Sequence, residues 1–252
     1  MKRVNLMVGG PQELIPFEIV KKRKNEPWVA TDHGAVVLLQ QGIVPKIALG
    51  DFDSSTNDDY QIVKEKVDNV YAFPPEKDYT DTQMGVITAF KQFNPDQLSI
   101  FGATGGRLDH LLANLFLPLE PRFYDKRDRI QYLDNQNVVD YLKPGEHTIK
   151  KVPGMKYLAI VELTPVTDLN LPDEKYTLAH FNSTRPISWA SNEFLGNVNH
   201  VSFKSGDIAI VQSKDAPQNS YTDPLKAKSK EDADESYYTQ NINSKLDKHR
   251  SK

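Results

Sequence analysis

The sequence predicts an α/β domain built on a parallel sheet, followed by an all-β domain of the sandwich type. In the first half, short apolar runs alternate with helical patterns, which is typical of a parallel sheet covered by helices. From about residue 129 the apolar runs are strand-like and are separated by turns that contain Pro or Gly. The chain has 252 residues, of which 38% are hydrophobic, and this is enough for one large core or two modest ones.

Five runs predict the strands of the first half: residues 3–8, 28–30, 46–49, 70–73 and 98–101. Two helices carry the clearest apolar stripes, because their apolar residues recur at the i, i+3, i+4, i+7 spacing of one helix face. One follows Asp78 and has Val86, Ala89, Phe90 and Phe93, and the other follows Gly106 and has Leu108, Leu111, Leu112 and Leu115. We expect both stripes to be buried.

The second half predicts strands at residues 130–133, 138–142, 157–163, 200–203 and 208–212. The charged stretch 122–129 offers little to a core, so we expect the boundary there, with an α/β domain at 1–125 and a β-sandwich at 126–214. Residues 215–252 are polar and mixed in charge, and they lack the apolar density that offsets ordering entropy. We expect them to form a mobile tail.

The composition excludes several kinds of site and partner. With no cysteine, disulfides, thiolate metal sites and a cysteine nucleophile are excluded, so a metal must be held by oxygen or imidazole, which favours magnesium. The net charge of -3 gives no general attraction for nucleic acid. No apolar stretch approaches the roughly 20 residues that span a membrane, and the first residues lack a secretory layout. We therefore expect a cytoplasmic protein with no nucleic-acid or membrane partner.

Four polar clusters follow predicted strands. They are "TDHGA" at 31–35, "GDFDS" at 50–54, "KDYTD" at 77–81 and "GATGGRLDH" at 102–110. In an open parallel sheet, ligands bind outside the carboxyl ends of the strands. We expect these clusters to converge on one pocket at that edge.

The acidic pairs have two interpretations each. If the chain stays extended, the carboxylates of Asp51 and Asp53 project to one face, and such a pair suits magnesium; the alternative is a turn that ends the strand. Asp78 can cap the following helix with Asp81 in its first turn, where the helix dipole favours both. The alternative places these carboxylates beside Asp51 and Asp53.

The glycine-rich cluster predicts a phosphate site. Gly102, Gly105 and Gly106 precede a helix and can turn amide N–H groups toward an anion, and Arg107 adds a fork that suits phosphate. His110 is either a half-buried, hydrogen-bonded histidine or a nucleotide contact, and Asp109 favours the helix dipole or orients Arg107. No Walker "GKS" follows the glycines. The predicted nucleotide-binding residues are Lys77, Asp78, Thr104, Gly105, Gly106, Arg107 and His110.

Together with "SNEFLG" at 191–196, these motifs resemble the thiamine pyrophosphokinase family over about residues 4–213. The resemblance implies a homodimer, with thiamine bound in a cleft between subunits. It also implies transfer of a pyrophosphoryl group from ATP, the co-substrate, to the thiamine hydroxyl, which gives thiamine diphosphate and AMP.

By position, the resemblance suggests that Asp51, Asp53 and Asp81 hold magnesium (Mg2+) and the triphosphate, and with Arg107 they form the catalytic set. The residues that it places near thiamine are Asp32, Gln83, Ser191 and Asn192. The chain departs from the family pattern at His33 and Asp173, where glycine is usual, and both departures touch the thiamine side.

Two other functions fit part of the sequence. "IALGDFDSS" also resembles the strand and nucleophilic aspartate of a haloacid-dehalogenase-like phosphatase, in which Asp51 is the nucleophile. That alternative does not explain "GATGGRLDH". The non-enzymatic alternative is a nucleotide-sensing protein that has lost turnover.

Overall fold

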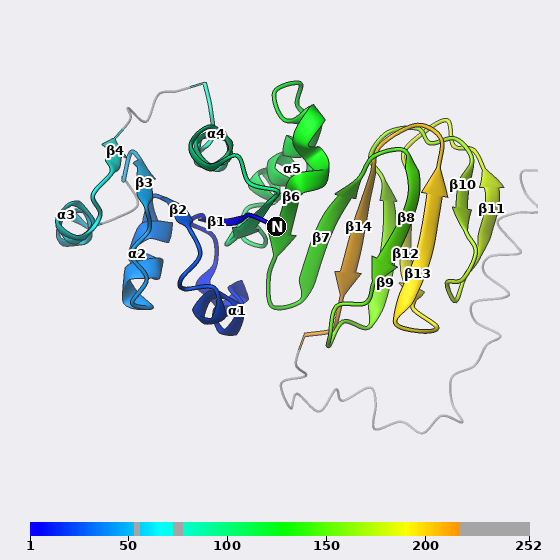
Figure 1. Cartoon of the computed structure of the whole chain (residues 1–252), viewed down its shortest axis with the longest axis horizontal. Helices are drawn as coiled ribbons and strands as arrows, with labels where there is room; N and C mark the ends of the chain where they lie inside the picture. The colour runs from blue at the N-terminus through cyan, green and yellow to red at the C-terminus, as the bar shows by residue number, and fades with distance from the viewer. Residues whose placement is uncertain (53–55, 73–77, 217–252) are drawn as a thin grey trace, which may run out of the picture. The chain divides into compact units, whose positions relative to one another are not determined.

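The computed structural model describes residues 1–52, 56–72 and 78–216. Within them, the strands form a ten-stranded sheet in the order β12-β9-β14-β7-β6-β5-β1-β2-β3-β4 and a four-stranded sheet in the order β11-β10-β13-β8 (Figure 1). The predicted α/β and β regions are both present, so the predicted fold class is confirmed.

The strands of the first region are β1 (Arg3–Met7), β2 (Trp28–Thr31), β3 (Ile47–Gly50), β4 (Val70–Ala72), β5 (Gln97–Phe101) and β6 (Ile130–Leu133). Each pairs in parallel with its neighbour in the order β6-β5-β1-β2-β3-β4. The chain builds β1 to β4 on one side and then returns to place β5 on the other side of β1. The strand order therefore reverses beside β1, which is where open α/β sheets bind ligands.

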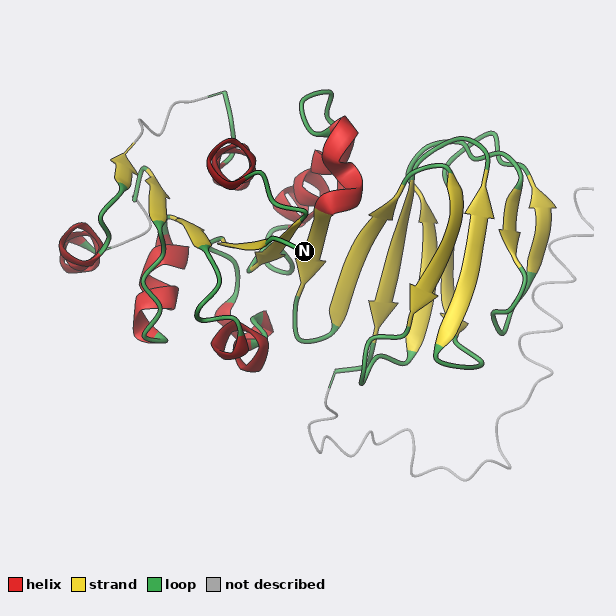
Figure 2. Cartoon of the chain, in the orientation of Figure 1, coloured by secondary structure: helices red, strands yellow, loops and turns green. Residues whose placement is uncertain are grey.

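Helices cover both faces of the parallel strands (Figure 2). They are α1 (Phe17–Lys22), α2 (His33–Gln40), α3 (Asn57–Lys66), α4 (Asp81–Phe93) and α5 (Leu108–Phe116), with 3-10 turns η1 (Gln12–Leu14), η2 (Leu117–Leu119) and η3 (Tyr124–Arg129). Val86, Ala89 and Phe90 of α4 pack into one core, and Val20, Val37 and Val63 of α1, α2 and α3 pack into another. The parallel strands are thus apolar on both faces, as a sheet between two helical layers requires.

The cap of α4 differs from the prediction. Thr80, rather than Asp78, is the N-cap residue, and it forms a capping box with Gln83. Thr56 and Asp59 form the same box at the start of α3. Asp81 lies in the first turn of α4, as predicted, where the helix dipole favours its carboxylate.

The predicted burial of the α5 stripe is wrong for two of its four residues, because Leu111 and Leu115 are half-buried while Leu108 and Leu112 are exposed. Leu108 is 67% exposed and Leu112 is 45% exposed, and Phe116, one turn further on, is 46% exposed. Within α5, Asn114 is the buried residue, and its side-chain amide donates to the Ala103 carbonyl at 2.8 Å. The helix is therefore attached through this polar contact and through Leu115, which packs against the core, and it leaves the apolar side chains of its other side at the surface.

The second region is antiparallel. Its strands are β7 (Asn137–Leu142), β8 (Gly145–Lys150), β9 (Tyr157–Glu162), β10 (Leu169–Leu171), β11 (Leu178–Phe181), β12 (Ser188–Glu193), β13 (Val198–Phe203) and β14 (Ile208–Ser213). Leu158, Ile160 and Ile210 of the large sheet share a core with Val201 and Phe203 of the small sheet. Hydrogen bonds run from β5 through β6 to β7 without a break, so the two regions share one sheet. A domain boundary at residue 125 stays a prediction, and the tail from residue 217 lies outside the described residues.

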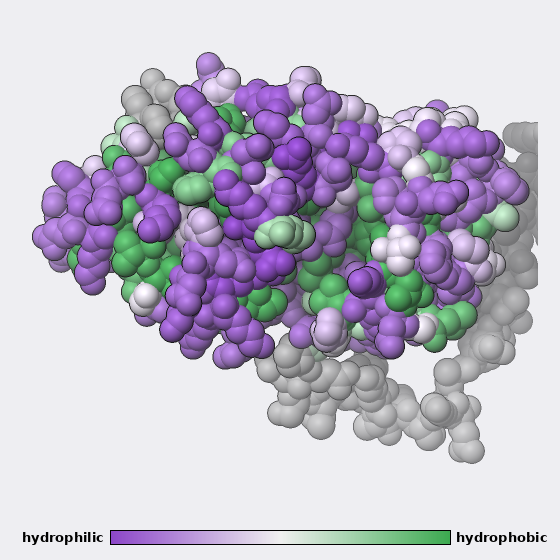
Figure 3. Space-filling model, in the orientation of Figure 1, coloured by the Kyte–Doolittle hydropathy of each residue, from purple (hydrophilic) through white to green (hydrophobic). Residues whose placement is uncertain are grey.

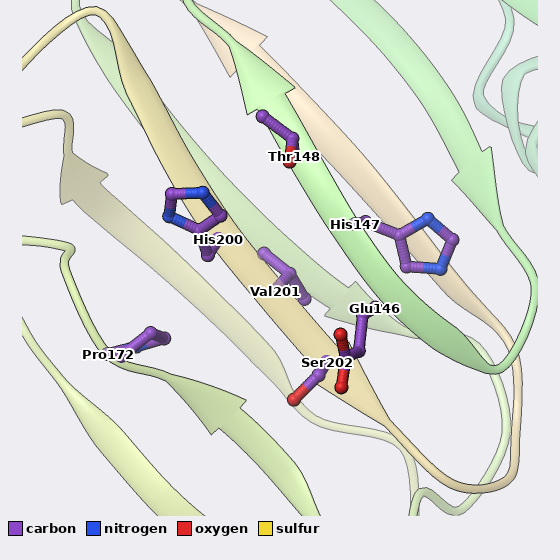
Figure 4. A pocket seen from close by; sticks show the side chains of 7 residues that line it. All are labelled: Glu146, His147, Thr148, Pro172, His200, Val201 and Ser202. Carbon is purple, nitrogen blue, oxygen red and sulfur yellow. The ribbon is translucent and has the colours of Figure 1, made fainter.

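The outer face of the small sheet is polar and slightly hollowed. His200 lies opposite Thr148, and Ser202 lies opposite Glu146 (Figure 4). Asp173 accepts hydrogen bonds from the His200 backbone N–H at 2.8 Å, and its second oxygen lies 2.6 Å from His200 Nδ1. The pKa of Asp173 lies below its usual range, because these His200 contacts outweigh the opposing effect of burial. Asp173 thus ties the chain after β10 to the neighbouring strand.

A buried ion pair joins the two regions. Arg127 Nε lies 2.6 Å from Asp207 Oδ1, and both side chains are less than a tenth exposed. The Arg127 guanidinium also lies 3.9 Å from the centre of the Tyr124 ring, and the Tyr124 hydroxyl donates to Asp207. Because Asp207 precedes β14, this cluster fixes η3 against the β region. None of the helices that the structure describes is long and apolar enough to cross a membrane.

We expect Asp207→Asn to lower the free energy of unfolding by about 3–5 kcal/mol, because it leaves the Arg127 charge buried and unpaired. Urea denaturation monitored by circular dichroism measures this change. The matched control is Asp128→Asn, which breaks the exposed Lys143–Asp128 pair and should cost less than about 1 kcal/mol. Equal losses in the two variants would contradict the assigned role of the buried pair.

Candidate active site

Three carboxylates meet at the carboxyl edge of the parallel strands. Asp32 follows β2, Asp51 follows β3, and Asp81 begins α4. The pKa of Asp32 is raised to about 7, chiefly by burial, with smaller contributions from the nearby Asp81 and Asp51 carboxyl groups, while the Phe52 amide opposes the shift. Asp32 and Asp81 also share a hydrogen bond. The structure therefore brings together three of the predicted site residues, from separate parts of the chain.

Backbone geometry around Gly50 makes room for this cluster. A Cβ atom at Gly50 would lie 1.8 Å from Asp32 Oδ1, and Gly50 has a φ of 149°. Asp32 Oδ1 accepts a hydrogen bond from the Phe52 backbone N–H at 3.0 Å. Phe52 has a φ of 57°, so the extended conformation expected from Asp51 onward does not continue past it. The strand ends in a turn that is tied to the Asp32 carboxylate.

A loop that the sequence analysis missed links this cluster to the glycine-rich segment. It follows β1 and begins with Gly9 and Gly10, where a Cβ at Gly10 would lie 2.0 Å from the Gly102 carbonyl oxygen. On the other side, Gln12 Nε2 lies 3.0 Å from His33 Nε2. The sequence feature that could have predicted this loop as part of the site is the pair of glycines directly after the first predicted strand. This loop fills the place where the strand order reverses.

The glycine-rich loop is braced from behind. Gly105 and Gly106 have φ values of 74° and 65°, which is backbone geometry that an anion-binding nest uses. The Thr104 hydroxyl donates to Asp134 Oδ2 at 2.6 Å, and Asp134 in turn accepts from the backbone N–H groups of Gln136 and Asn137. The Thr104 side chain is therefore held by the β6–β7 turn, while the two glycines are exposed.

Arg107 and Asp109 form a two-point contact at the surface. Arg107 Nε and Nη2 lie 3.1 and 2.5 Å from the two oxygens of Asp109. This contact is the one expected if Asp109 orients Arg107, and Asp109 also lies in the first turn of α5, where the helix dipole favours it. His110 is exposed, so the half-buried alternative for it is wrong. Asp78 is also exposed, beyond the end of β4.

The residues predicted to contact thiamine lie in two places. Gln83 completes the α4 cap and donates to Glu120 Oε1 at 2.6 Å. Ser191 and Asn192 lie in β12, where Ser191 is exposed with a φ of 61°. Asn192 is buried, and its side-chain amide both donates to and accepts from the Tyr176 backbone at 2.9 Å. Among these residues, Asp32 belongs to the carboxylate cluster, and Ser191 is the one with an exposed side chain.

The donor set suits a hard cation. Carboxylate oxygens are the ligands that magnesium takes at phosphate sites, and a cation would relieve the repulsion among Asp32, Asp51 and Asp81. Among the residues that the structure describes, no three acidic or histidine side chains are arranged closely enough to hold a metal ion. Asp53 and Lys77, two further predicted ligand-binding residues, lie outside the described residues.

Comparison with known proteins agrees with this organisation. A family model described as the catalytic domain of thiamin pyrophosphokinase matches residues 21–132, and one described as the vitamin B1 binding domain of thiamin pyrophosphokinase matches residues 146–208. Matches in this order define a class of two-part enzymes, in which an α/β catalytic region precedes a vitamin-binding β region.

Individual relatives give the same result. The chain is 32% identical to thiamine pyrophosphokinase of Bacillus subtilis over 217 residues, which are 85% of this chain and 100% of the relative. A crystal structure of a thiamin pyrophosphokinase family protein from Enterococcus faecalis has a TM-score of 0.81 and 41% identity, and covers 85% of this chain and 100% of its own. The Bacillus subtilis crystal structure has a TM-score of 0.76 and 31% identity, with the same coverage.

The chain therefore belongs to the thiamine pyrophosphokinase family. The membership confirms the resemblance seen in the motifs and the prediction of an enzyme that transfers a pyrophosphoryl group from ATP.

We expect Asp32→Asn to change how stability depends on pH in the metal-free protein. Below about pH 3 the native and unfolded Asp32 are both largely protonated. As the pH rises to about 7 the unfolded carboxyl ionises first, so the native state loses stability through this group. Asparagine has the shape of aspartate but does not ionise, so the substitution removes this loss. The change in the free energy of unfolding caused by Asp32→Asn should therefore be more favourable at pH 8 than at pH 4, by roughly 2–4 kcal/mol.

Urea denaturation of both proteins at the two pH values, in the presence of a chelator, measures the difference. A carbon-13 NMR titration of the Asp32 carboxyl provides an independent check. A pKa near the usual aspartate value would contradict the burial and the carboxylate contacts assigned to Asp32.

Proposed function

We propose that the chain transfers the pyrophosphoryl group of ATP to the hydroxyl of thiamine at the carboxyl edge of its parallel strands. The observation that carries this proposal is the proximity of Asp32, Asp51 and Asp81 at the same edge of the sheet from which the glycine-rich loop leaves β5, within a family of thiamine pyrophosphokinases. The cytoplasmic location expected from the sequence stays a prediction.

The acidic side of the site is assigned to magnesium and the triphosphate. Asp51 and Asp81, together with Asp53, would hold the ion, which neutralises phosphate charge when bound. The raised pKa of Asp32 supports this assignment, because it reflects carboxyl groups that lie close together in a buried place. Binding a cation there would favour their ionised forms.

The glycine-rich side is assigned to the phosphates of ATP. The N–H groups around Gly105 and Gly106 precede α5, and the start of a helix attracts anions. Arg107 is exposed, and Asp109 holds its planar fork. Lys77, Asp78 and His110 remain candidates for further nucleotide contacts.

The acceptor side is assigned to Asp32, Gln83 and Ser191. Asn192 would act on thiamine through the backbone that it holds, because its side-chain amide is engaged by Tyr176. His33 lies directly after Asp32 and contacts Gln12, so it places an imidazole where the family usually has a glycine. This difference would bear on the choice of acceptor.

The reaction is a single displacement at phosphorus. The thiamine hydroxyl oxygen forms a bond to the β-phosphorus of ATP, the bond from that phosphorus to the α,β-bridging oxygen breaks, and AMP leaves. A carboxylate of the acidic cluster, Asp53 or Asp81, accepts the hydroxyl proton. The protein contributes mainly alignment and charge neutralisation. The family assignment favours this reaction over hydrolysis through an aspartyl-phosphate at Asp51.

We also propose that the active form is a homodimer. The apolar side chains of Leu108, Leu112 and Phe116 recur every four residues along the exposed face of α5. Such a stripe on a soluble domain marks a contact surface, and a second copy of the chain is the occupant we assign to it. Because α5 directly follows the glycine-rich loop, the partner would lie beside the phosphate site.

We expect Asp51→Asn and Asp53→Asn each to reduce kcat at least about a hundredfold, because each removes charge that the phosphate site requires. Mass spectrometry of thiamine diphosphate and AMP formed from ATP, thiamine and magnesium measures the reaction. Asp58→Asn is the control, since Asp58 is an exposed acidic residue of α3. AMP release that does not depend on thiamine would contradict the transferase assignment.

We expect Leu112→Glu to convert the protein to a monomer, because it introduces a charge at the centre of the α5 stripe. Size-exclusion chromatography with light scattering gives the mass. Val44→Glu is the control, because Val44 is 55% exposed outside α5. A native protein that is monomeric at micromolar concentration, or a Leu112→Glu protein that remains a dimer, would contradict the proposed surface.

A further inference from the structure

A cavity of about 670 Å³ lies on the sheet face opposite α4 and α5. Its walls come from α1, from the strands β6 and β7, and from the segment that connects β8 to β9. None of the described residues predicted for ATP, thiamine or magnesium lines it. In Figure 3, hydrophobic side chains reach the surface between α1 and β7. The cavity is therefore separate from the site assigned to catalysis.

Apolar side chains make about half of its walls. Phe17 and Ile19 come from α1, Leu133 and Val138 come from the β6–β7 hairpin, and Met155 comes from the connecting segment. Leu133, Val138 and Met155 are buried and belong to the core beneath α1 and α2. A concave space of this size, with apolar walls on one part and charged and polar groups on the rest, can hold a small molecule that has both kinds of group.

Two arginines lie at one end of the cavity. Arg23 Nη1 donates to the Asn5 side-chain oxygen at 3.2 Å, and the guanidinium lies 5.6 Å from the centre of the Phe101 ring. Arg3 donates to Gln97 and forms an ion pair with Glu26 at 3.2 Å. The pKa of Arg23 is lowered, chiefly by burial and further by the nearby Arg3 charge, while Glu26 opposes this. Arg23 thus carries a charge that its surroundings do not fully balance.

The acidic side chains in and beside the cavity are Asp134, Glu18 and Glu26. Asp134 accepts hydrogen bonds from Thr104 and from the turn around Asn137. Glu18 is exposed on α1, and Glu26 is held by Arg3 and by the Asn5 amide. Among the described residues, the Arg23 guanidinium donates a hydrogen bond to the Asn5 side-chain oxygen, which is neutral. Lys214 adds a further positive charge to the lining.

We propose that this cavity is a binding site for a small organic anion with an apolar body, such as an aromatic carboxylate, sulfonate or phosphate ester. The anionic group binds Arg23 and Arg3, and the apolar body packs against Phe17, Val138 and Met155. A half-buried guanidinium suits such a group, because hydrogen bonds from a charged donor are stronger where water is partly excluded.

The probe for a test is 1-anilinonaphthalene-8-sulfonate, whose fluorescence rises in apolar surroundings. The full-length native protein should bind one equivalent, and saturating ATP, magnesium and thiamine should not displace it. Arg23→Gln should weaken binding at least about tenfold, the usual worth of a charged hydrogen bond, while Lys22→Gln, its exposed neighbour on α1, should not. N-phenyl-1-naphthylamine, the same aromatic body without the sulfonate, should bind more weakly and be insensitive to Arg23→Gln.

Other outcomes overturn the proposal. These are absence of binding, displacement by ATP or thiamine, loss of binding in Leu112→Glu, and equal affinity of Arg23→Gln for the probe. Near-UV circular dichroism of each protein excludes a loosened core as the source of fluorescence. If Arg23→Gln does not fold, Arg3→Gln replaces it and should weaken binding in the same direction.

Discussion

The contact between the Asp32 carboxylate and the backbone after β3 is the constraint on which the site depends. Asp32 Oδ1 occupies the space that a side chain at residue 50 would fill, and it accepts the Phe52 N–H. The position is occupied by glycine because no larger residue leaves room for the carboxylate. This one contact fixes the end of β3, turns the chain at Asp51, and sets the distance between two acidic segments that are nearly twenty residues apart.

Continuity of the large sheet explains how one chain combines two architectures. β6 is parallel to β5 on one side and antiparallel to β7 on the other, so it closes the α/β region and opens the β region. Because the strand is shared, backbone hydrogen bonds fix how the two halves are placed relative to each other. The buried pair of Arg127 and Asp207 adds a side-chain contact across the same junction, where a charge left unpaired would be costly.

Much of the fold could be predicted from the sequence, because burial on both faces leaves a continuous apolar run in each parallel strand. Local chemistry was harder to predict. Asp78 and Thr80 both suit a helix start, and the choice of Thr80 follows from its reciprocal contact with Gln83. The left-handed turn at Phe52 could not be predicted, since it depends on a carboxylate from β2. The α5 stripe has the spacing of a buried face, and periodicity alone does not distinguish packing within the chain from packing against another molecule.

Asp134 shows how the two faces of the sheet are connected. One of its oxygens holds Thr104 in the glycine-rich loop, and its side chain also lines the cavity beneath α1. The backbone N–H groups of Gln136 and Asn137 donate to its other oxygen, so the β6–β7 turn holds the carboxylate that holds the loop. Since these hydrogen bonds are buried, moving Asp134 would cost the contacts on both sides. The shape of the glycine-rich loop and the shape of the cavity therefore depend on the same turn.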